Sequence, residues 1–165
     1  MNECVQFQID CGSDRTCFNT QGAYECVDVP CPIGYERENG TDCILKCIQH
    51  SMTCSHRRAS HVRYRFLALS RSTPLNQTLF HFPTLVENSL TTAILIDRNH
   101  MKDMLPFYLD GSILKNNQIL INSNDFEFEI HLYLTDIQRK SFSSHLRRRL
   151  HTLFMIRINV SPFHF

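Results

Sequence analysis

The chain has 165 residues, of which 42% are hydrophobic and 20% are charged. These are ordinary values for a globular protein, and they exclude a chain that is disordered throughout. The net charge of +1 argues against a nucleic-acid binder, which usually carries a strong basic excess. No apolar stretch is long enough to span a bilayer, since the best one, Leu153–Ile156, is followed directly by Arg157.

All eight cysteines lie in the first third of the chain. They are Cys4, Cys11, Cys17, Cys26, Cys31, Cys43, Cys47 and Cys54. An even number in so short a stretch predicts a disulfide framework made in an oxidising compartment. A segment of this size buries too little apolar surface to fold unaided, and each disulfide would contribute roughly 2–4 kcal/mol. Spacing alone leaves about fifteen possible pairings for the first six cysteines.

The residues before Cys4 lack the basic and apolar regions of a signal peptide. Because disulfides require secretion, we expect the chain to be a segment of a longer secreted protein. Three N-x-S/T triplets, at Asn39, Asn76 and Asn159, are candidate glycosylation sites that fit this location. Such triplets also arise by chance, so they support secretion only weakly.

The run Cys17-Phe-Asn-Thr-Gln-Gly-Ala-Tyr-Glu-Cys26 matches the calcium-binding EGF-like pattern C-x-(D/N)-x4-(F/Y)-x-C. Asn2-Glu3-Cys4 resembles the end of the entry motif of the same family, and residues 32–35 resemble the turn in its last loop. The resemblance predicts an EGF-like module over residues 1–43. The disulfides that it implies are Cys4–Cys17, Cys11–Cys26 and Cys31–Cys43.

The same resemblance implies a calcium site. Calcium takes about six to eight oxygen ligands. The family pattern assigns a carboxylate to Glu3, a side-chain oxygen to Asn19, and backbone carbonyls to Thr20 and Ala23. A further aspartate belongs just before Met1, and without it the affinity would be weak even for an extracellular site of about 10⁻⁴–10⁻³ M. The alternative is that Glu3 and Asn19 only cap turns.

Zinc is the rival use of these cysteines. Cys43, Cys47, Cys54 and His56 lack the tight C-x2-C spacing that structural zinc sites favour. We therefore expect Cys47 and Cys54 to form a fourth disulfide, which closes a small loop in a junction over residues 44–60.

From about Val62 onward, apolar and polar residues alternate, which predicts strands with one buried and one solvent-exposed face. Arg63, Arg65 and Glu129 are predicted to lie on the exposed face. The predicted strands are 62–66, 90–96, 107–109, 113–121, 126–134 and 156–160. Clusters of Asn, Asp, Ser and Gly separate them as turns. Residues 140–150 could form a helix, but their serines favour a long polar connection. The pattern indicates an all-β antiparallel sandwich over residues 61–165.

Four residues separate Cys26 from Cys31, in the run Cys-Val-Asp-Val-Pro-Cys, where ordinary EGF modules have one. This run resembles the last EGF-like module of fibulins and hemicentins, which precedes a C-terminal fibulin-type module. The resemblance covers the whole chain and implies a secreted extracellular matrix protein that binds other matrix proteins, with calcium stiffening the EGF-like module. A secreted EGF-type signalling ligand is the alternative, but such ligands usually lack the Asn19 and Tyr24 pattern.

No catalytic motif is present: there is no G-x-S-x-G, no H-E-x-x-H and no glycine-rich phosphate loop. His50, His56 and His61 lie near the junction, where histidines are more often exposed or structural than catalytic. We therefore predict a protein that is not an enzyme.

The densest charge on the chain is the run Arg147-Arg148-Arg149. A solvated loop is the simplest interpretation. Clustered arginines also pair well with sulfates, so contact with a glycosaminoglycan is the sharper hypothesis. Cleavage by a basic-site protease is a third.

Overall fold

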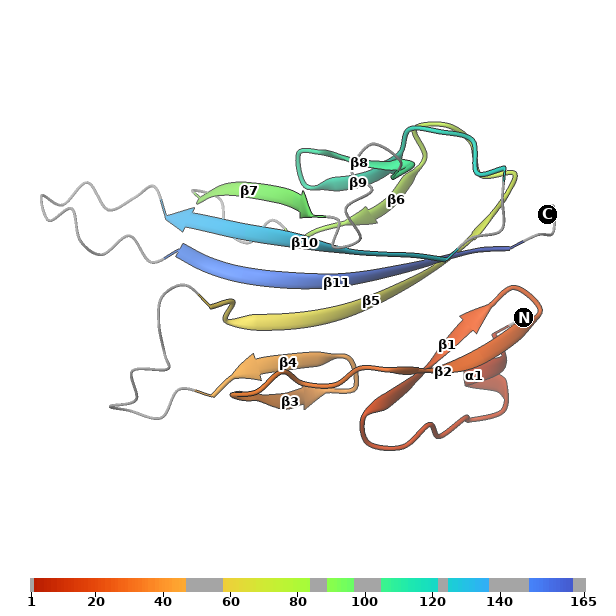
Figure 1. Cartoon of the computed structure of the whole chain (residues 1–165), viewed down its shortest axis with the longest axis horizontal. Coiled ribbons are helices and arrows are strands. Elements are labelled where there is room, and N and C mark those ends of the chain that lie inside the picture. Colours follow the sequence, from red (N-terminus) through yellow and green to blue (C-terminus); the bar gives the residue numbers. More distant parts are fainter. Residues whose placement is uncertain are drawn as a thin grey trace, which may run out of the picture.

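The computed structural model describes residues 2–46, 58–83, 89–96, 105–121, 125–136 and 149–161. Its strands form a two-stranded sheet, a six-stranded sheet and a three-stranded sheet (Figure 1). None of the helices in these ranges has the length and apolar character needed to cross a membrane.

The N-terminal region combines one short helix with two hairpins. Its elements are α1 (Glu3–Gln6), β1 (Arg15–Thr20), β2 (Ala23–Asp28), β3 (Tyr35–Asn39) and β4 (Asp42–Leu45). Asn2 caps α1 by accepting a hydrogen bond from the backbone of Val5 at 3.3 Å. The three disulfides are Cys4–Cys17, Cys11–Cys26 and Cys31–Cys43, the same pairs that the family resemblance implies.

The six-stranded sheet has the order β3-β4-β5-β11-β10-β7. Its long strands are β5 (His61–Ser70), β7 (Ser89–Ile96), β10 (Asp125–Asp136) and β11 (Arg149–Ser161). Neighbouring strands are antiparallel except for β5 and β11, which are parallel. The three-stranded sheet has the order β6-β9-β8 and consists of β6 (Thr78–His81), β9 (Ile113–Asn116) and β8 (Phe107–Asp110).

The hydrophobic core lies between these two sheets. We call the face of the six-stranded sheet that meets β6-β9-β8 the inner face, and the opposite one the outer face. Phe154 is 1% exposed and its ring packs edge-on against Phe82, 4.9 Å between centroids. Buried residues of both layers surround this contact: Phe107, Leu114, Leu120, Phe128, Ile130, Leu132, Ile156, Ile158 and Val160. Strand alternation therefore supplies the sandwich with one continuous core.

The predicted fold class is confirmed, with a disulfide-rich EGF module followed by a domain of mostly antiparallel strands. The predicted strands are all present, although the one expected over 113–121 ends at Asn116. Strand β6 was not predicted, and the parallel β5–β11 pair departs from the purely antiparallel sandwich expected. Of the polar connection expected over 140–150, Arg149 and Leu150 belong to β11, and the rest lies outside the described residues.

The six-stranded sheet continues across the predicted module boundaries. Hairpin β3–β4 belongs to the EGF-like module by sequence, yet β4 pairs with β5, with Cys43 opposite Val62 and Ile44 opposite His61. The backbone hydrogen bonds of the sheet therefore join the two modules. The boundaries at 43/44 and 60/61 stay predictions, and the expected Cys47–Cys54 disulfide lies outside the described residues.

Candidate functional site

Two of the predicted calcium ligands lie together beside α1 and hairpin β1–β2. Glu3 stands in α1 and Asn19 in β1, and the Cys4–Cys17 disulfide joins these two elements. The backbone N–H of Glu3 donates to Oδ1 of Asn19 at 2.7 Å. This hydrogen bond holds α1 against β1 at the position of these two residues.

The two predicted carbonyl ligands flank the β1–β2 turn. Thr20 and Ala23 are cross-strand partners, and Gly22 between them has a φ of +84°, a backbone conformation that glycine adopts without strain. The carbonyl of Thr20 accepts from Nδ2 of Asn19 at 3.2 Å, and that of Ala23 accepts from the Thr20 hydroxyl at 3.0 Å. The network thus ties three of the predicted ligand residues into one corner of the module.

Two buried side-chain oxygens in this corner have no hydrogen-bond partner within the described ranges. They are Oε2 of Glu3 and Oε1 of Gln21, in the turn between Thr20 and Gly22. A buried acceptor without a partner costs about 1–3 kcal/mol, so such atoms call for an explanation. An oxygen-seeking cation would satisfy the Glu3 carboxylate. Gln21 was not singled out from the sequence, because the family pattern leaves its position open.

Calcium is consistent with this set of donors, which are all oxygens: one carboxylate, one amide and two carbonyls. Among the described residues, no three His, Cys, Asp or Glu side chains gather as a metal cluster. A site built largely from amide and carbonyl oxygens does not depend on such a cluster.

The opposite side of hairpin β1–β2 packs against the outer face of the large sheet. The ring of Phe18 lies 5.3 Å from that of Phe66 in β5, centroid to centroid. Glu25 pairs with Arg157 of β11 at 3.2 Å. Arg157 also contacts Asp125 at 3.1 Å, and these acids outweigh the effect of its burial and raise its pKa. We call the four residues Phe18, Glu25, Phe66 and Arg157 the hairpin contact.

A cavity of about 220 Å³ lies beside the hairpin contact. Its walls come from β2 of the EGF-like module and from β5, β10 and β11 of the sheet. They include Val27, Tyr64, Phe66, Glu129, Met155 and Arg157. The two modules therefore line a partly open pocket between them as well as sharing a sheet.

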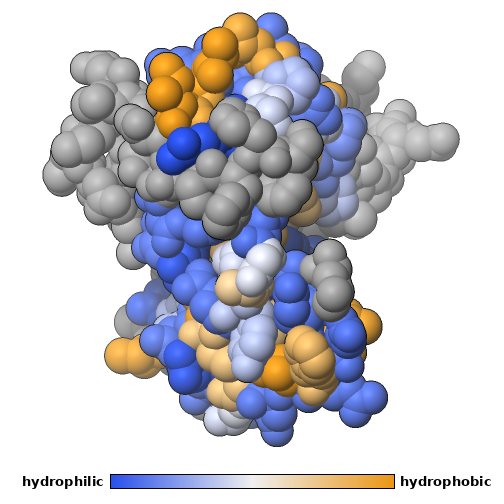
Figure 2. Space-filling view, turned by 90° about the vertical axis from the view of Figure 1, so that its right-hand side faces the viewer, coloured by the Kyte–Doolittle hydropathy of each residue, from blue (hydrophilic) through white to orange (hydrophobic). Residues whose placement is uncertain are grey.

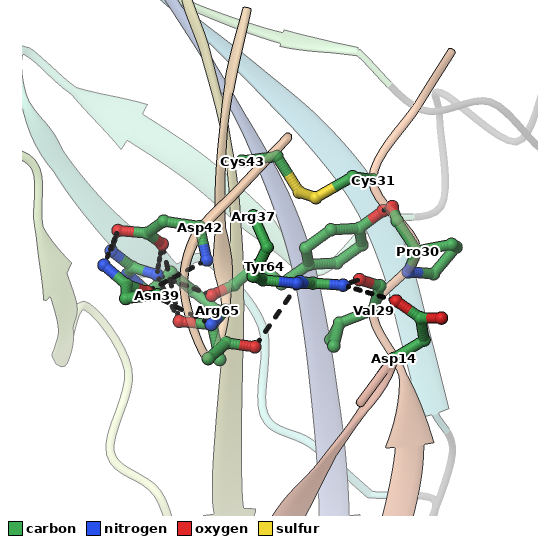
Figure 3. Close-up of a disulfide and its surroundings, with 12 residues drawn as sticks. Asp14, Val29, Pro30, Cys31, Arg37, Asn39, Asp42, Cys43, Tyr64 and Arg65 are labelled. Atoms are coloured by element: carbon green, nitrogen blue, oxygen red, sulfur yellow. Dashed lines mark hydrogen bonds and ion pairs between the residues drawn. A yellow bond between two sulfur atoms is a disulfide. The ribbon is translucent and has the colours of Figure 1, made fainter. Parts of the chain in front are cut away.

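A second set of contacts surrounds the Cys31–Cys43 disulfide (Figure 3). Arg37 of β3 donates to the carbonyl of Val29 and pairs with Asp14 at 3.2 Å. The hydroxyl of Tyr64 in β5 donates to the carbonyl of Pro30 at 2.6 Å. The segment between Cys26 and Cys31 is thus fixed on one side by the EGF-like module and on the other by the sandwich.

Asp42 of β4 is buried between two arginines of β5, on the inner face. Arg65 donates to its carboxylate at 2.7 Å (Figure 3). Arg63 approaches the same carboxylate to 3.7 Å. Burial raises the pKa of Asp42, but hydrogen bonding and the charge of Arg65 outweigh burial, and the pKa is lowered overall. The expectation that Arg63 and Arg65 face water was wrong, since both are half-buried.

The outer face carries a polar cluster on β10 and β11. Nδ1 of His131 lies 2.9 Å from Nε2 of His151, and Nε2 of His131 lies 3.4 Å from a carboxylate oxygen of Glu129, which is 5% exposed. The ring of Tyr133 stacks on His151 at 4.5 Å. Burial, and then the neighbouring His131, lower the pKa of His151. This cluster corrects the expectation that residue 129 lies on a wet face.

The predicted glycosylation sites lie apart from one another. Asn39 and Asn76 are exposed, and Asn159 is half-buried on β11, where its side chain donates to Asp125 at 2.7 Å. Of the predicted glycosaminoglycan contact, Arg147 and Arg148 lie outside the described residues, and Arg149 begins β11. Both sets stay predictions.

Apolar side chains are exposed on the EGF-like module. Figure 2 shows the end of the molecule that carries this module, and apolar residues gather in the lower half of that view. Val5 in α1 and Phe7 at its C-cap are 72% and 58% exposed, and Tyr24 of β2 is 44% exposed. These side chains leave apolar surface of the module exposed to solvent.

The N-terminal module matches a known protein family, and nearly the whole chain matches known proteins. The calcium-binding EGF domain family matches residues 1–43. Human Hemicentin-1 is 25% identical over 168 residues, which is 99% of this chain, and mouse Hemicentin-1 is 25% identical over 96% of it. Mouse Hemicentin-2 is 42% identical over 71 residues, or 42% of the chain. No solved structure matches.

The chain spans only 1–3% of the length of these relatives. Its disulfides, its EGF domain and the matches to hemicentins nevertheless all indicate a protein of the extracellular matrix. The chain carries a calcium-binding EGF domain over residues 1–43, is homologous to the hemicentins over nearly its whole length, and is a secreted extracellular matrix protein.

Proposed function

We propose that the chain acts as a structural and adhesion module that binds other matrix proteins and catalyses no reaction. Its EGF domain is a calcium-stiffened spacer, and the sandwich provides a docking surface. The observation that carries the calcium part is the 2.7 Å hydrogen bond that places Glu3 against Asn19, together with the buried Glu3 oxygen beside it.

Calcium would be held by the side chains of Glu3 and Asn19 and by the carbonyls of Thr20 and Ala23. When bound, the ion supplies a positive charge that draws these oxygens together. The residues themselves set the geometry: the Cys4–Cys17 disulfide positions α1 against β1, and Gly22 permits the tight turn. Four ligands are fewer than the usual six to eight or so, so water or other residues must complete the shell.

A calcium titration of the secreted chain, followed by amide NMR shifts, tests this site. We expect saturable shifts at Glu3, Asn19 and Thr20 in the millimolar range, at about 10⁻⁴–10⁻³ M or weaker. Glu3→Gln combined with Asn19→Ala should abolish them. Glu38→Gln is the matched control, because it removes an exposed acid of β3 outside this corner. Equal shifts in all three proteins would refute the site.

Binding to matrix proteins follows from the homology and from the exposed strands of the sheet. Edge strands offer unpaired backbone groups to a second chain. In the six-stranded sheet, β7 and β3 stand at the edges. Surface plasmon resonance against purified matrix glycoproteins tests this function directly. Receptor phosphorylation by the purified chain, without matrix binding, would instead favour the alternative of a signalling ligand.

The arginine run at 147–149 is a proposed contact for sulfated glycosaminoglycans, because guanidinium groups pair well with sulfates. Replacing all three arginines by alanine should lower retention on a heparin column at low salt. Unchanged retention of the triple variant would leave the run as an ordinary solvated loop.

A further inference from the structure

Hairpin β1–β2 has two faces with different partners. Side chains alternate across a strand, so neighbouring residues point to opposite sides. One side holds Cys17 and Cys26, whose disulfides run to Cys4 and Cys11, together with Asn19. The other side holds Phe18 and Glu25, and these make the hairpin contact with the sandwich. Three of the proposed calcium ligands, Asn19, Thr20 and Ala23, thus share one pair of strands with the docking residues Phe18 and Glu25.

The hairpin contact joins two cross-strand pairs. Phe18 stands opposite Glu25 in the β1–β2 register, and Phe66 stands opposite Arg157 in the β5–β11 register. The aromatic member of one pair meets the aromatic member of the other, and the carboxylate meets the guanidinium. Because Phe18 is buried, the docked position of the hairpin removes apolar surface from water. In Figure 1 the hairpin lies below the right-hand part of β5.

We infer that the β1–β2 hairpin couples calcium binding to the docking of the EGF domain on the sandwich. This inference rests on the calcium site proposed above. Asn19 follows Phe18 directly in β1, and Tyr24 and Glu25 adjoin in β2 opposite them. An ion that holds Glu3 against Asn19 fixes the backbone that positions Phe18 and Glu25. The calcium-bound hairpin is therefore the better docking partner for Phe66 and Arg157.

Coupling of this kind is reciprocal. If calcium strengthens docking by a given factor, docking strengthens calcium binding by the same factor. A change on the sandwich side of the hairpin contact must therefore weaken calcium binding, although it touches no ligand. Phe66 is suited to this test, because it lies in β5 and far from the ligands in sequence.

The experiment measures the calcium dissociation constant of the full chain by NMR titration. Phe66→Ala should raise it roughly fivefold, at the low end of measured couplings. Glu25→Gln should raise it by about twofold, since exposed ion pairs are weak. Phe80→Ala is the matched control: it truncates another half-buried phenylalanine, which packs on Phe82 and Phe154 across the sandwich. It should leave the constant unchanged.

Hydrogen exchange gives a second readout that does not depend on affinity. Calcium should slow exchange of amides in β5 near Phe66 and in β11 near Arg157 in the wild type, and should not do so in Phe66→Ala. If the wild type and Phe66→Ala bind calcium equally well, the coupling is refuted while the calcium site stands. If the wild type binds no calcium, the proposed site and the coupling both fall.

Discussion

The EGF domain and the sandwich reach stability by different means. The EGF domain contains three disulfides within 43 residues, and only a few of its apolar side chains, such as Phe18, Val27 and Val29, are buried. The described part of the sandwich, by contrast, packs eleven buried residues into a single core, and nine of them lie in strands of the two sheets. The difference follows from size, because a chain of about 40 residues cannot bury enough apolar surface without covalent links.

The comparison also shows where the division fails. Hairpin β3–β4 is closed by the Cys31–Cys43 disulfide and yet extends the sheet of the sandwich. The two modes of stabilisation therefore meet in one hairpin. Whether the chain unfolds as two units or as one depends on how strongly this hairpin and the hairpin contact link them.

The largest effect is expected in the sandwich core. Phe154→Ala removes a ring that is 1% exposed and contacts both Phe80 and Phe82. The lost burial and the remaining cavity should lower the free energy of unfolding by about 3–5 kcal/mol. Urea denaturation measures this change. Leu75→Ala, at a side chain that is 50% exposed, is the control and should change it by less than about 0.5 kcal/mol. A comparable loss in both variants would argue against the core described above.

Loss of a disulfide should act mainly on the EGF domain. The paired change Cys4→Ser and Cys17→Ser opens the link between α1 and β1, and should cost about 2–4 kcal/mol locally. Hydrogen exchange would rise in β1 and β2, while the urea midpoint of the sandwich would shift little. An equal loss of protection in β10 and β11 would show that the two modules unfold as one cooperative unit.

A smaller effect is expected where the two modules share the sheet. Asp42→Asn removes the charge that holds Arg63 and Arg65 on the inner face. Hydrogen bonds to charged groups contribute about 1.5–3 kcal/mol. Because the arginines are partly exposed, we expect the free energy of unfolding to fall by an amount near the lower end of this range. Glu36→Gln, which breaks an exposed pair with Lys46, is the control for charge removal in the neighbouring strand. If thermal unfolding of both variants matches the wild type, Asp42 does not link β4 to β5.

The sequence predicted much of this molecule, because its strongest signals are local. The Cys17–Cys26 motif identified the EGF domain, and the alternation over 126–134 located β10. Alternation of apolar and polar residues does not reveal that a sheet is covered by protein on both faces. Here the inner face meets β6-β9-β8, while the outer face meets hairpin β1–β2. Arg65 and Glu129 were therefore assigned to solvent, although each is held by polar partners inside the protein.

Pairing between strands that are distant in sequence was the second feature that the sequence did not predict. Nothing in the local pattern indicates that β5 pairs in parallel with β11, or that β4 joins the sheet of the next module. These pairings depend on which distant strands bury each other. The corner around Glu3 and Asn19 was accessible through its motif, but the buried oxygen of Gln21 needed the folded turn.

The smallest predicted effect is a difference in the pH at which acid weakens each of the two modules. Because burial lowers the pKa of His151 below its ordinary value of 6.5, the unfolded chain takes up this proton before the folded chain does. Stability from this residue is full above pH 6.5 and falls as the pH drops below it. Asp42 also has a lowered pKa, from an ordinary value of 3.8. Its contribution persists above pH 3.8 and is lost only below that value.

Acid titration should therefore weaken the chain in two steps, the first below pH 6.5 at the outer face and the second below pH 3.8 at the β4–β5 pair. Around His151 the described charged or titratable side chains are His131, Glu129 and Tyr133, and the facing residues of β7 are uncharged. Urea midpoints at pH 7.5, 5.5 and 3 measure both steps. His151→Gln should remove the first step alone and Asp42→Asn the second, because the two groups lie on opposite faces of the sheet. A first step that survives in His151→Gln would place the acid-sensitive group elsewhere.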